Sequence, residues 1–299
     1  MTFGQLRTFL EVTRQGSIRG AASALFITEP SVSAAVSSLE KELKVELFER
    51  AGRGIRATPA GEELAGHAAE MLGLQERAVR LTQEAAGRPR SLRLAAVTTA
   101  AEYILPTYLQ AFRTRLPDVE LRLEVGNRAT VIESLLTHRA DLGIGGRPPD
   151  EGGIVGEPFL ANLLVVVGGP DHPLAGARVI LPEQLDGETW LMREAGSGTR
   201  HATEEFLAVR GSSYPAIMTL GSNGAVKQAA ALGMGLTLVS EEAVKAELAA
   251  GTLVRLHVRG TPVLRSWHVL RLEGSEPGES AARFLRLLHT HRHSGLIPT

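Results

Sequence analysis

The sequence of 299 residues contains no cysteine and no long apolar run. Without cysteine the chain forms no disulfides and has no thiolate chemistry, which fits a reducing cytoplasm. The longest wholly apolar run, residues 163–167, is far shorter than the ~20 residues that a membrane helix needs. Charged residues at positions 7, 11 and 14 interrupt the N-terminal segment, which therefore differs from a secretory leader. We expect a cytoplasmic protein that contacts no membrane.

The chain also has almost no net charge. Its formal charge is −1 at pH 7 and its pI is about 6.8, so the whole molecule lacks the electrostatic signature of nucleic-acid binding. Residues 1–60 hold eight Lys and Arg against six Asp and Glu, a net charge of +2. A DNA-binding prediction must therefore depend on the pattern of residues rather than on charge.

Motifs of catalysis are missing as well. Residues 196–199 (GSGT) lack the Lys-Ser/Thr ending of a phosphate-binding P-loop. Neither a G-x-S-x-G nucleophile turn nor an H-E-x-x-H zinc motif occurs. His289, His291 and His293 could bind a metal, but a fraying C-terminus is the simpler interpretation. We expect no enzyme: no catalytic residues, no metal site and no resident cofactor.

The first sixty residues show helical periodicity. Apolar residues recur every three or four positions over residues 3–13, which predicts a first helix. Gly16 ends this helix, and Ser17 caps a second helix that is rich in Gly and Ala and reaches residue 25. Thr28 caps a third helix, with Pro30 tolerated in its first turn. The apolar residues expected to face inward in the third helix are Val32, Val36, Leu39 and Leu43.

The other faces of the third helix carry small and hydroxylated side chains. Such side chains allow a helix to approach base edges and phosphates closely in a DNA major groove. Residues 47–50 and 53–58 then predict two short strands around a glycine turn, a wing with arginines at its tip. Arginine in a narrow minor groove gains from the focused negative potential there. The alternative is a small, all-helical interaction module.

A longer motif favours DNA binding. Its members are Thr28, Pro30, Val32, Ser33, Val36, Leu39, Glu40, Leu43, Leu47, Phe48, Arg50, Gly52, Arg53, Thr58, Pro59, Ala60 and Gly61. At these spacings the segment resembles the DNA-binding unit of the LysR family of transcriptional regulators. The resemblance implies a winged helix-turn-helix in residues 1–58 and a set of DNA-binding residues: Thr28, Pro30, Ser31, Ser33, Ala34, Ser37, Arg50, Arg53 and Arg56.

Two positions depart from the family pattern. Glu29 stands where the family has glutamine, and Ala34 stands where many members have arginine. A carboxylate near DNA is repelled by phosphates, although it can accept a hydrogen bond from cytosine N4. The base contacts of the family therefore do not carry over directly at these two positions.

Residues 59–86 contain helix formers and no internal proline after Pro59. Leu64, Met71, Ala78 and Ala85 are seven residues apart, and Leu74 and Leu81 strengthen this imperfect heptad seam. The simple alternative is an amphipathic helix packed on its own domain. The resemblance implies an antiparallel linker-helix homodimer that assembles into a tetramer. Residues 87–90 are interpreted as a hinge, so that residues 59–90 form the linker.

Strand-like and helical segments alternate from residue 91 onward. Expected strands cover residues 92–97, 119–125, 142–145, 163–167, 191–193, 217–220 and 236–239. Expected helices cover residues 103–115, 131–137, 200–210, 225–232 and 241–249. This alternation favours parallel α/β packing, so the whole chain is α+β. The resemblance implies an effector domain over residues 91–299 like periplasmic binding proteins, with subdomain I at 91–160 plus 266–295 and subdomain II at 161–265.

Ligands bind such sheets at the carboxyl ends of strands, where helix N-termini offer unpaired N–H groups. Several turns there carry hydroxyl, amide or guanidinium groups, which favours a small anionic effector. The candidate effector-binding residues are Thr98, Thr99, Thr130, Gly146, Arg147, Arg193, Ser197, Thr199, Arg200 and Asn223. The alternative for each turn is an ordinary helix cap.

The C-terminal part also resembles one branch of the LysR family, the regulators of carbon-fixation genes. The resemblance depends on residues 98–106, 146–149, 171–176, 193–200 and 221–229. It implies an organic phosphate or a carboxylate as effector. We therefore expect a regulator that binds operator DNA, responds to a metabolite and contacts RNA polymerase if it is an activator. The alternative is a solute-binding protein without a DNA-binding role.

Overall fold

The computed structural model describes residues 1–52, 54–208 and 216–294 of the chain. The chain divides into two compact units: Met1–Arg88 with Leu136–Arg139, and Pro89–Leu135 with Ala140–Thr299. Within the described residues, no helix combines the length and apolar character that crossing a membrane requires. We call these units the DNA-binding unit and the effector unit because their elements correspond to the two halves expected from the sequence.

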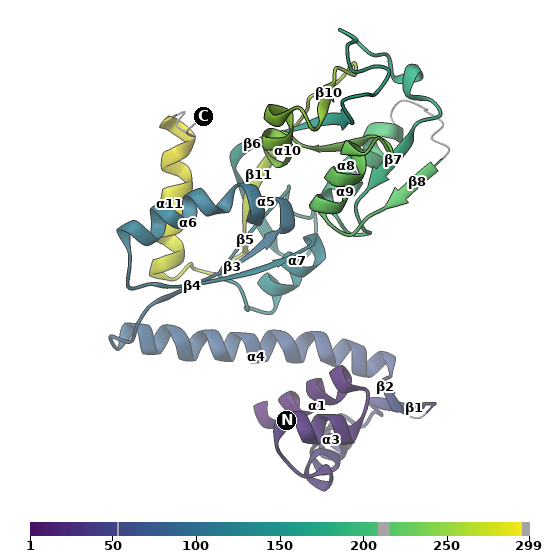
Figure 1. Ribbon diagram of the computed structural model, residues 1–299. Helices are drawn as coiled ribbons and strands as arrows, with labels where there is room; N and C mark the ends of the chain where they lie inside the picture. Colours follow the sequence, from purple (N-terminus) through teal and green to yellow (C-terminus); the bar gives the residue numbers. More distant parts are fainter. Residues whose placement is uncertain (53, 209–215, 295–299) are drawn as a thin grey trace. The chain divides into compact units, whose positions relative to one another are not determined.

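The DNA-binding unit is a helical bundle with a two-stranded wing (Figure 1). Its elements are α1 (Phe3–Gln15), α2 (Ile18–Leu25), α3 (Glu29–Leu43), β1 (Phe48–Ala51), β2 (Gly54–Ala57) and α4 (Pro59–Ala85). The side chains of Thr2, Ser17, Thr28 and Thr58 each accept a hydrogen bond from a backbone N–H in the first turn of the following helix. The helix starts expected at Ser17 and Thr28 are therefore correct.

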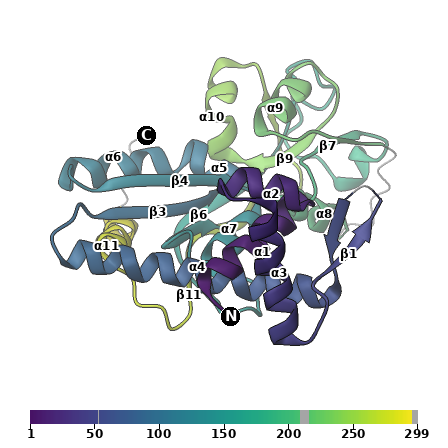
Figure 2. The same cartoon turned by 90° about the horizontal axis from the view of Figure 1, so that it is seen from below.

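The core of this unit joins α1, α3 and the N-terminal half of α4 (Figure 2). Its buried members are Leu6, Phe9, Leu39, Leu47, Ala68 and Leu72. Val32 and Val36 lie in a second cluster with α2, as expected. Leu43 was expected to face inward, but it is 39% exposed. The reason is its place in the last turn of α3, beyond Leu39, which is the last buried position of that helix.

Two glycines allow the wing and α4 to approach their neighbours closely. The backbone N–H of Ile55 donates to Gly16 O at 3.0 Å, and a Cβ on Gly54 would lie 2.7 Å from the same oxygen. A Cβ on Gly61, in the first turn of α4, would lie 2.2 Å from Leu47 O. Real Cβ atoms do not approach a backbone oxygen so closely. Glycine at these positions therefore fixes how the wing and α4 join the bundle.

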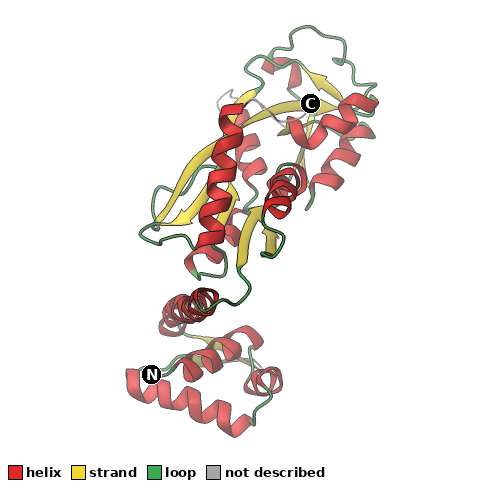
Figure 3. Cartoon of the chain, turned by 90° about the vertical axis from the view of Figure 1, so that its left-hand side faces the viewer, coloured by secondary structure: helices red, strands yellow, loops and turns green. Residues whose placement is uncertain are grey.

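The effector unit is built on a mixed sheet with helices on both faces (Figure 3). Its strands are β3 (Ser91–Val97), β4 (Glu120–Gly126), β5 (Leu142–Gly145), β6 (Ile154–Gly168), β7 (Thr189–Met192), β8 (Ala216–Thr219), β9 (Thr237–Ser240), β10 (Val254–Leu256) and β11 (Val263–Leu272). Over the described residues, the main sheet has the order β10-β6-β11-β5-β3-β4, with β9 also paired to β6. β7 and β8 form a separate parallel pair.

Two long antiparallel strands run through both parts of the effector unit. β11 pairs over its whole length with residues 154–164 of β6, and Leu160 is opposite Trp267. The expectation of parallel packing in two sheets is therefore wrong in part: β3 is parallel to β4 and β5, but β11 is antiparallel to both β5 and β6. The sequence signal was local, and it covered only residues 163–167 of β6. Pairing with the distant β11 extends this strand back to Ile154.

The helices of this unit are α5 (Thr98–Tyr103), α6 (Leu105–Arg115), α7 (Arg128–Leu136), α8 (Gly198–Ala208), α9 (Asn223–Ala231), α10 (Glu241–Ala250) and α11 (Glu279–Ser294), with a 3-10 turn at Pro182–Leu185. One expected helix over 103–115 is replaced by α5 and α6, so Thr98 and Thr99 begin a helix rather than form a turn. α11 includes His289, whose side chain lies 3.2 Å from Glu157. The side chains of His291 and His293 lie outside the described residues.

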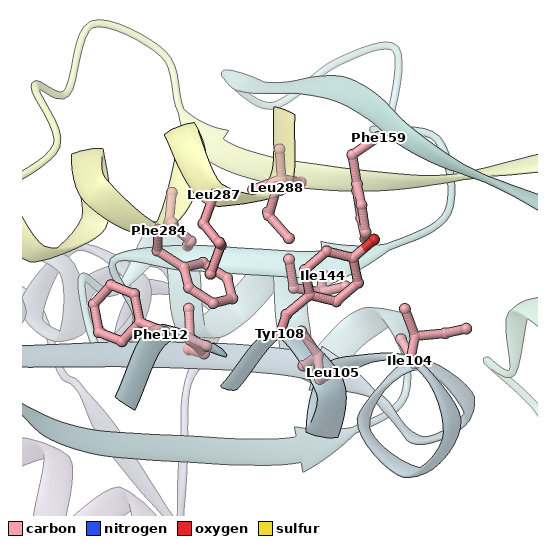
Figure 4. Close-up of a cluster of buried hydrophobic side chains, with 14 of the residues drawn as sticks. Ile104, Leu105, Tyr108, Phe112, Ile144, Phe159, Phe284, Leu287 and Leu288 are labelled. Atoms are coloured by element: carbon pink, nitrogen blue, oxygen red, sulfur yellow. The ribbon is translucent and has the colours of Figure 1, made fainter. Parts of the chain in front are cut away.

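Aromatic and aliphatic side chains form the core under α6 and α11 (Figure 4). Phe112 and Phe284 pack edge to face with ring centroids 5.4 Å apart, and Tyr108 packs the same way on Phe159 at 5.8 Å. This core holds β3, β5 and the two helices together. It therefore fixes the strand ends from which the candidate effector residues project.

Candidate DNA-binding face and effector site

The exposed face of α3 gathers the short side chains expected to meet DNA. Pro30, Ser31, Ser33, Ala34 and Ser37 are all exposed. The hydroxyl of Thr28 accepts a hydrogen bond from the N–H of Ser31 at 3.3 Å and lies 2.8 Å from the Ser31 hydroxyl. Thr28 therefore has a structural role at the helix start. Glu29, the first residue of the helix, is exposed on the same end.

The wing carries the expected arginines on paired strands. Arg50 is exposed on β1 opposite Ile55 of β2. Arg56 is opposite Glu49, and its guanidinium Nε lies 2.5 Å from the Glu49 carboxylate. This pairing offsets part of the positive charge of the wing. Arg53, at the predicted tip, lies outside the described residues.

Within the effector unit, four side chains from three chain segments form one hydrogen-bonded network. Asn223, the first residue of α9, accepts a hydrogen bond from Arg193 through Oδ1. Its Nδ2 donates to Thr99 Oγ1 at 3.3 Å and to Glu102 Oε2 at 3.0 Å. Arg193, Thr99 and Asn223 are all buried. Three of the expected effector residues, Thr99, Arg193 and Asn223, are therefore brought together after the carboxyl ends of β3, β7 and β8.

The charge of Arg193 is offset inside the protein. Its Nε and Nη2 donate to the two carboxylate oxygens of Glu194 at 2.7 and 2.9 Å. Burial acts to raise the pKa of Glu194, but hydrogen bonds from Arg193 and from its own backbone N–H outweigh burial and lower that pKa. An anion bound here would join an existing ion pair rather than a free guanidinium.

Other expected residues lie at nearby strand ends. Thr98 donates to Gly126 O at 3.3 Å, where β4 ends. Asn127 Oδ1 accepts from the N–H of Thr130 at 3.0 Å and from its hydroxyl at 3.2 Å. A Cβ on Gly196 would lie 3.2 Å from Asn127 Nδ2, so the turn before α8 lies beside the turn after β4. The turns that follow β4 and β7 thus converge.

The remaining candidates differ in their surroundings. Ser197 is buried immediately before α8, and Thr199 follows it in the first turn. Arg200 pairs with Glu204 at 2.7 Å and donates to Arg193 O at 3.3 Å, which links it to the network. Gly146 and Arg147 are exposed, and Arg147 pairs with Asp150 at 3.3 Å. Arg147 therefore has a partner of its own, separate from the network around Asn223.

Sequence reasoning missed Glu102 and the side chains around Lys227. Lys227 of α9 donates to Tyr103 OH at 3.1 Å and to Ala243 O at 2.9 Å, and lies 2.7 Å from Glu247. Burial acts to lower the pKa of Lys227, but hydrogen bonds with Glu247 and Tyr103 outweigh it and raise that pKa. Placing the helix start at Thr98 would have revealed Glu102, because residues three apart on a helix lie on one face.

Glu102 and Lys227 both connect α5 to α9. Asn223 meets Glu102, and Lys227 meets Tyr103, one turn further along α9. These contacts join the part of the effector unit that follows β3 to the part that follows β8. A ligand that changed the Asn223 contacts would therefore change how these two parts are held together.

Comparison with known proteins gives the family of both halves. Residues 3–62 match the bacterial regulatory helix-turn-helix protein model of the lysR family, and residues 85–292 match the LysR substrate binding domain model. A RuBisCO operon transcriptional regulator of Allochromatium vinosum is 38% identical over 281 residues, which cover 94% of this chain and 93% of the relative. Such relatives are named as transcriptional regulators rather than enzymes.

Two of the solved structures that are similar to the chain contain a bound ligand or DNA. The regulatory domain of Synechocystis CcmR in complex with 2-PG is 36% identical, with a TM-score of 0.65, and covers 68% of this chain and 98% of that one. Full-length CbnR in complex with its target DNA is 22% identical, with a TM-score of 0.70, and covers 97% and 99%, which shows a shared fold. The chain belongs to the LysR family of DNA-binding transcriptional regulators, in the branch that contains the regulators of carbon fixation.

Proposed function

We propose that this regulator senses a small organic anion, a phosphate or a carboxylate, at the strand ends around Asn223. The supporting observation is the network in which Asn223 contacts both Arg193 and Thr99. A relative's regulatory domain was solved with 2-PG, 2-phosphoglycolate, which carries both kinds of anionic group. Hydroxyls and amides orient such a ligand, and a guanidinium pairs with it bidentately. The site residues would be Thr98, Thr99, Thr130, Arg193, Ser197, Thr199, Arg200 and Asn223, with Gly146 and Arg147 at its margin.

The test is titration calorimetry with 2-phosphoglycolate as the probe. Thr99→Val removes one hydroxyl at almost constant volume, and we expect it to weaken binding about tenfold, the loss of roughly one hydrogen bond to a charged group. Thr199→Val should act in the same direction. Thr114→Val is the matched control, because Thr114 is exposed on α6 and its hydroxyl donates to Gln110 O. Wild-type affinity in both Thr99→Val and Thr199→Val would place the ligand elsewhere.

We further propose that α3 and the wing bind operator DNA through Ser31, Ser33, Ala34, Ser37, Arg50, Arg53 and Arg56, with Thr28 and Pro30 shaping the helix start. The exposure of these short side chains on α3 supports close approach to a groove. The chain would then consist of a DNA-binding domain at residues 1–58, a linker at residues 59–90 and an effector domain at residues 91–299. In this proposal the protein binds DNA in the cytoplasm, and it contacts RNA polymerase if it activates transcription.

Effector binding would be linked to DNA binding through the shape of the effector unit. A ligand shifts a two-state equilibrium by no more than its differential affinity for the two states, so we expect a coupling of about 1–3 kcal/mol. Thr99→Val should therefore respond only at about tenfold higher effector concentration and keep the operator affinity that the protein has without effector. Gel-shift titrations with and without 2-phosphoglycolate measure both quantities. If Thr99→Val bound the operator more weakly than wild type in the absence of ligand, Thr99 would contribute to DNA binding and not only to the effector response.

A further inference from the structure

Over the first ten residues of α3, the exposed face contains one long side chain among short ones. From residue 30 to residue 38 the exposed side chains are those of Pro, Ser and Ala: Pro30, Ser31, Ser33, Ala34, Ser37 and Ser38. Glu29 precedes them and is exposed in the first turn of the helix. Glu29, Ser33 and Ser37 are four residues apart and form one stripe. Glu29 therefore reaches further than Ser33 and Ser37, and the next long side chain on this stripe, Lys41, lies in the last turn of the helix.

Glu29 lies at the N-terminal end of α3, the helix that would contact base edges in this architecture. In helix-turn-helix proteins the N-terminal residues of the second helix of the motif contact base edges in the major groove. Thr28 fixes this helix start, since its hydroxyl accepts from the Ser31 N–H. The positive end of the helix dipole also favours a carboxylate at this position. Glu29 is thus exposed at the N-terminal end of the helix proposed to enter the groove.

A carboxylate accepts hydrogen bonds and donates none. In the major groove cytosine shows only its N4 amino donor, whereas guanine and thymine show acceptors. Adenine shows the N6 donor beside the N7 acceptor, and N7 repels the second carboxylate oxygen. Phosphates repel the carboxylate as well. Cytosine is therefore the base edge that fits Glu29 best.

We propose that Glu29 is a specificity-determining residue that selects cytosine at one position of each operator half-site. A glutamine at the same place carries a donor and an acceptor, and it pairs with adenine N6 and N7. Glu29→Gln should therefore change the selected base from cytosine to adenine. This inference depends on the proposed DNA-binding role of α3.

The experiment selects binding sites for the full-length protein from a library of randomised DNA duplexes. Wild-type sites should contain one position per half-site where cytosine is preferred over adenine by about tenfold. Glu29→Gln should prefer adenine there, and Glu29→Ala should show no preference. Glu42→Gln is the matched control: it removes the same charge from α3 about 20 Å along the helix, where Glu42 pairs with the N-terminus. Control sites should match wild type.

Two outcomes would overturn the role of Glu29. One is that wild type, Glu29→Gln and Glu29→Ala select the same bases at every position of the binding site. Thermal unfolding curves must show that all three proteins are folded. The other is the same change of base in Glu42→Gln, which would make the effect one of general charge. Ser33→Asp tests separately whether α3 faces DNA at all. If α3 faces DNA, Ser33→Asp should abolish binding to all duplexes. Wild-type binding by Ser33→Asp would show that α3 does not face DNA.

Discussion

At the scale of single residues, Asn223 connects groups of opposite charge. Its amide oxygen accepts from the Arg193 guanidinium, and its amide nitrogen donates to the Glu102 carboxylate and to Thr99. Only a side chain with both a donor and an acceptor can accept a hydrogen bond from the guanidinium and donate one to the carboxylate. Because Asn223 is 4% exposed, water cannot replace it without a change in packing. Its substitution should therefore affect both stability and ligand binding.

Asn223→Ala should lower the free energy of unfolding of the effector unit by about 1–3 kcal/mol, because it leaves buried polar partners with fewer hydrogen bonds. Urea unfolding followed by circular dichroism measures this change. Asn223→Asp is the informative second variant, since it keeps an acceptor for Arg193 and places a carboxylate against Glu102. We expect Asn223→Asp to bind 2-phosphoglycolate worse than Asn223→Ala does. An unchanged urea midpoint in Asn223→Ala would show that the network carries no stability.

The Lys227–Glu247 pair predicts how stability depends on pH. Burial raises the pKa of Glu247, but hydrogen bonds from Lys227 and from its own backbone outweigh burial and hold that pKa below its ordinary value of 4.5. A lowered pKa stabilises the folded state above pH 4.5, and this stabilisation is lost as the pH falls through the folded-state value. Glu247→Gln should therefore cost about 1 kcal/mol at pH 7.

The same cost should shrink as the pH is lowered below 4.5, because wild type then loses the charged carboxylate too. Thermal unfolding of wild type and Glu247→Gln at several pH values between neutrality and acid gives this difference directly. Glu242→Gln is the control. Glu242 lies on the same helix, but its exposed pair with Lys245 is longer, at 4.0 Å, than the 2.7 Å between Lys227 and Glu247. A difference between wild type and Glu247→Gln that grows in acid would contradict the assignment.

At the scale of elements, local signals predicted the helices that precede β3 well, but they missed α5, the C-terminal helix α11 and the long strand β11. The starts of α2 and α3 follow from Ser17 and Thr28, which are adjacent in sequence to the apolar spacing of each helix. β11 was missed, because its sequence VLRSWHVLRL does not alternate and its exposure is set by pairing with β6, about a hundred residues earlier. Non-local pairing leaves little trace in a local pattern.

The candidate site shows the same division. Thr99, Arg193 and Asn223 were found because each lies at a strand end, and this position is a property of the topology. Glu102 was missed because Thr98 was assigned to a turn, and the interaction of Asn223 with α5 spans 121 residues. The neutralisation of Arg193 by Glu194 was also missed. Adjacent residues point in directions that a sequence alone does not give.

The junction of the wing with α4 gives a prediction at this scale. Gly61→Ala places a Cβ 2.2 Å from Leu47 O, so the backbone of the wing or of α4 must shift. We expect a loss of about 1–3 kcal/mol in stability of the DNA-binding unit, the usual cost of overpacking. Gly66→Ala is the matched control on the same helix, because a Cβ there meets no atom within 4 Å.

Gly66→Ala should raise stability by up to about 1 kcal/mol, as a glycine in a helix interior costs roughly that much. The two substitutions add the same methyl group to the same helix, so their opposite signs separate packing from helix propensity. Thermal unfolding together with gel-shift affinity measures both variants. Equal effects of the two substitutions would mean that Gly61 is not required for the close approach.

At the scale of the whole molecule, α4 has more apolar surface than its own bundle covers. Ala68 and Leu72 are buried in the core with α1. Leu74, which lies on the expected heptad seam, is 50% exposed, and Val79, which follows the seam position Ala78, is 46% exposed. Large apolar side chains exposed in succession on one helix are typical of an interface. With a net charge of −1 the chain has little non-specific attraction to DNA, so holding two DNA-binding units together would matter for affinity.

We predict that the exposed seam of α4, with Leu74 at its centre, joins two copies of the chain, and that effector units join two such dimers. Leu74→Glu places a charge in the seam and should halve the molar mass measured by light scattering at micromolar concentration. Operator affinity should fall by at least a hundredfold, because linked units bind two half-sites with a high effective concentration. Gln83→Glu is the control, since it adds the same charge at the heptad position farthest from the seam. If Leu74→Glu keeps the wild-type mass and affinity, the exposed surface of α4 is no dimer seam, and another surface must bring two DNA-binding units to one operator.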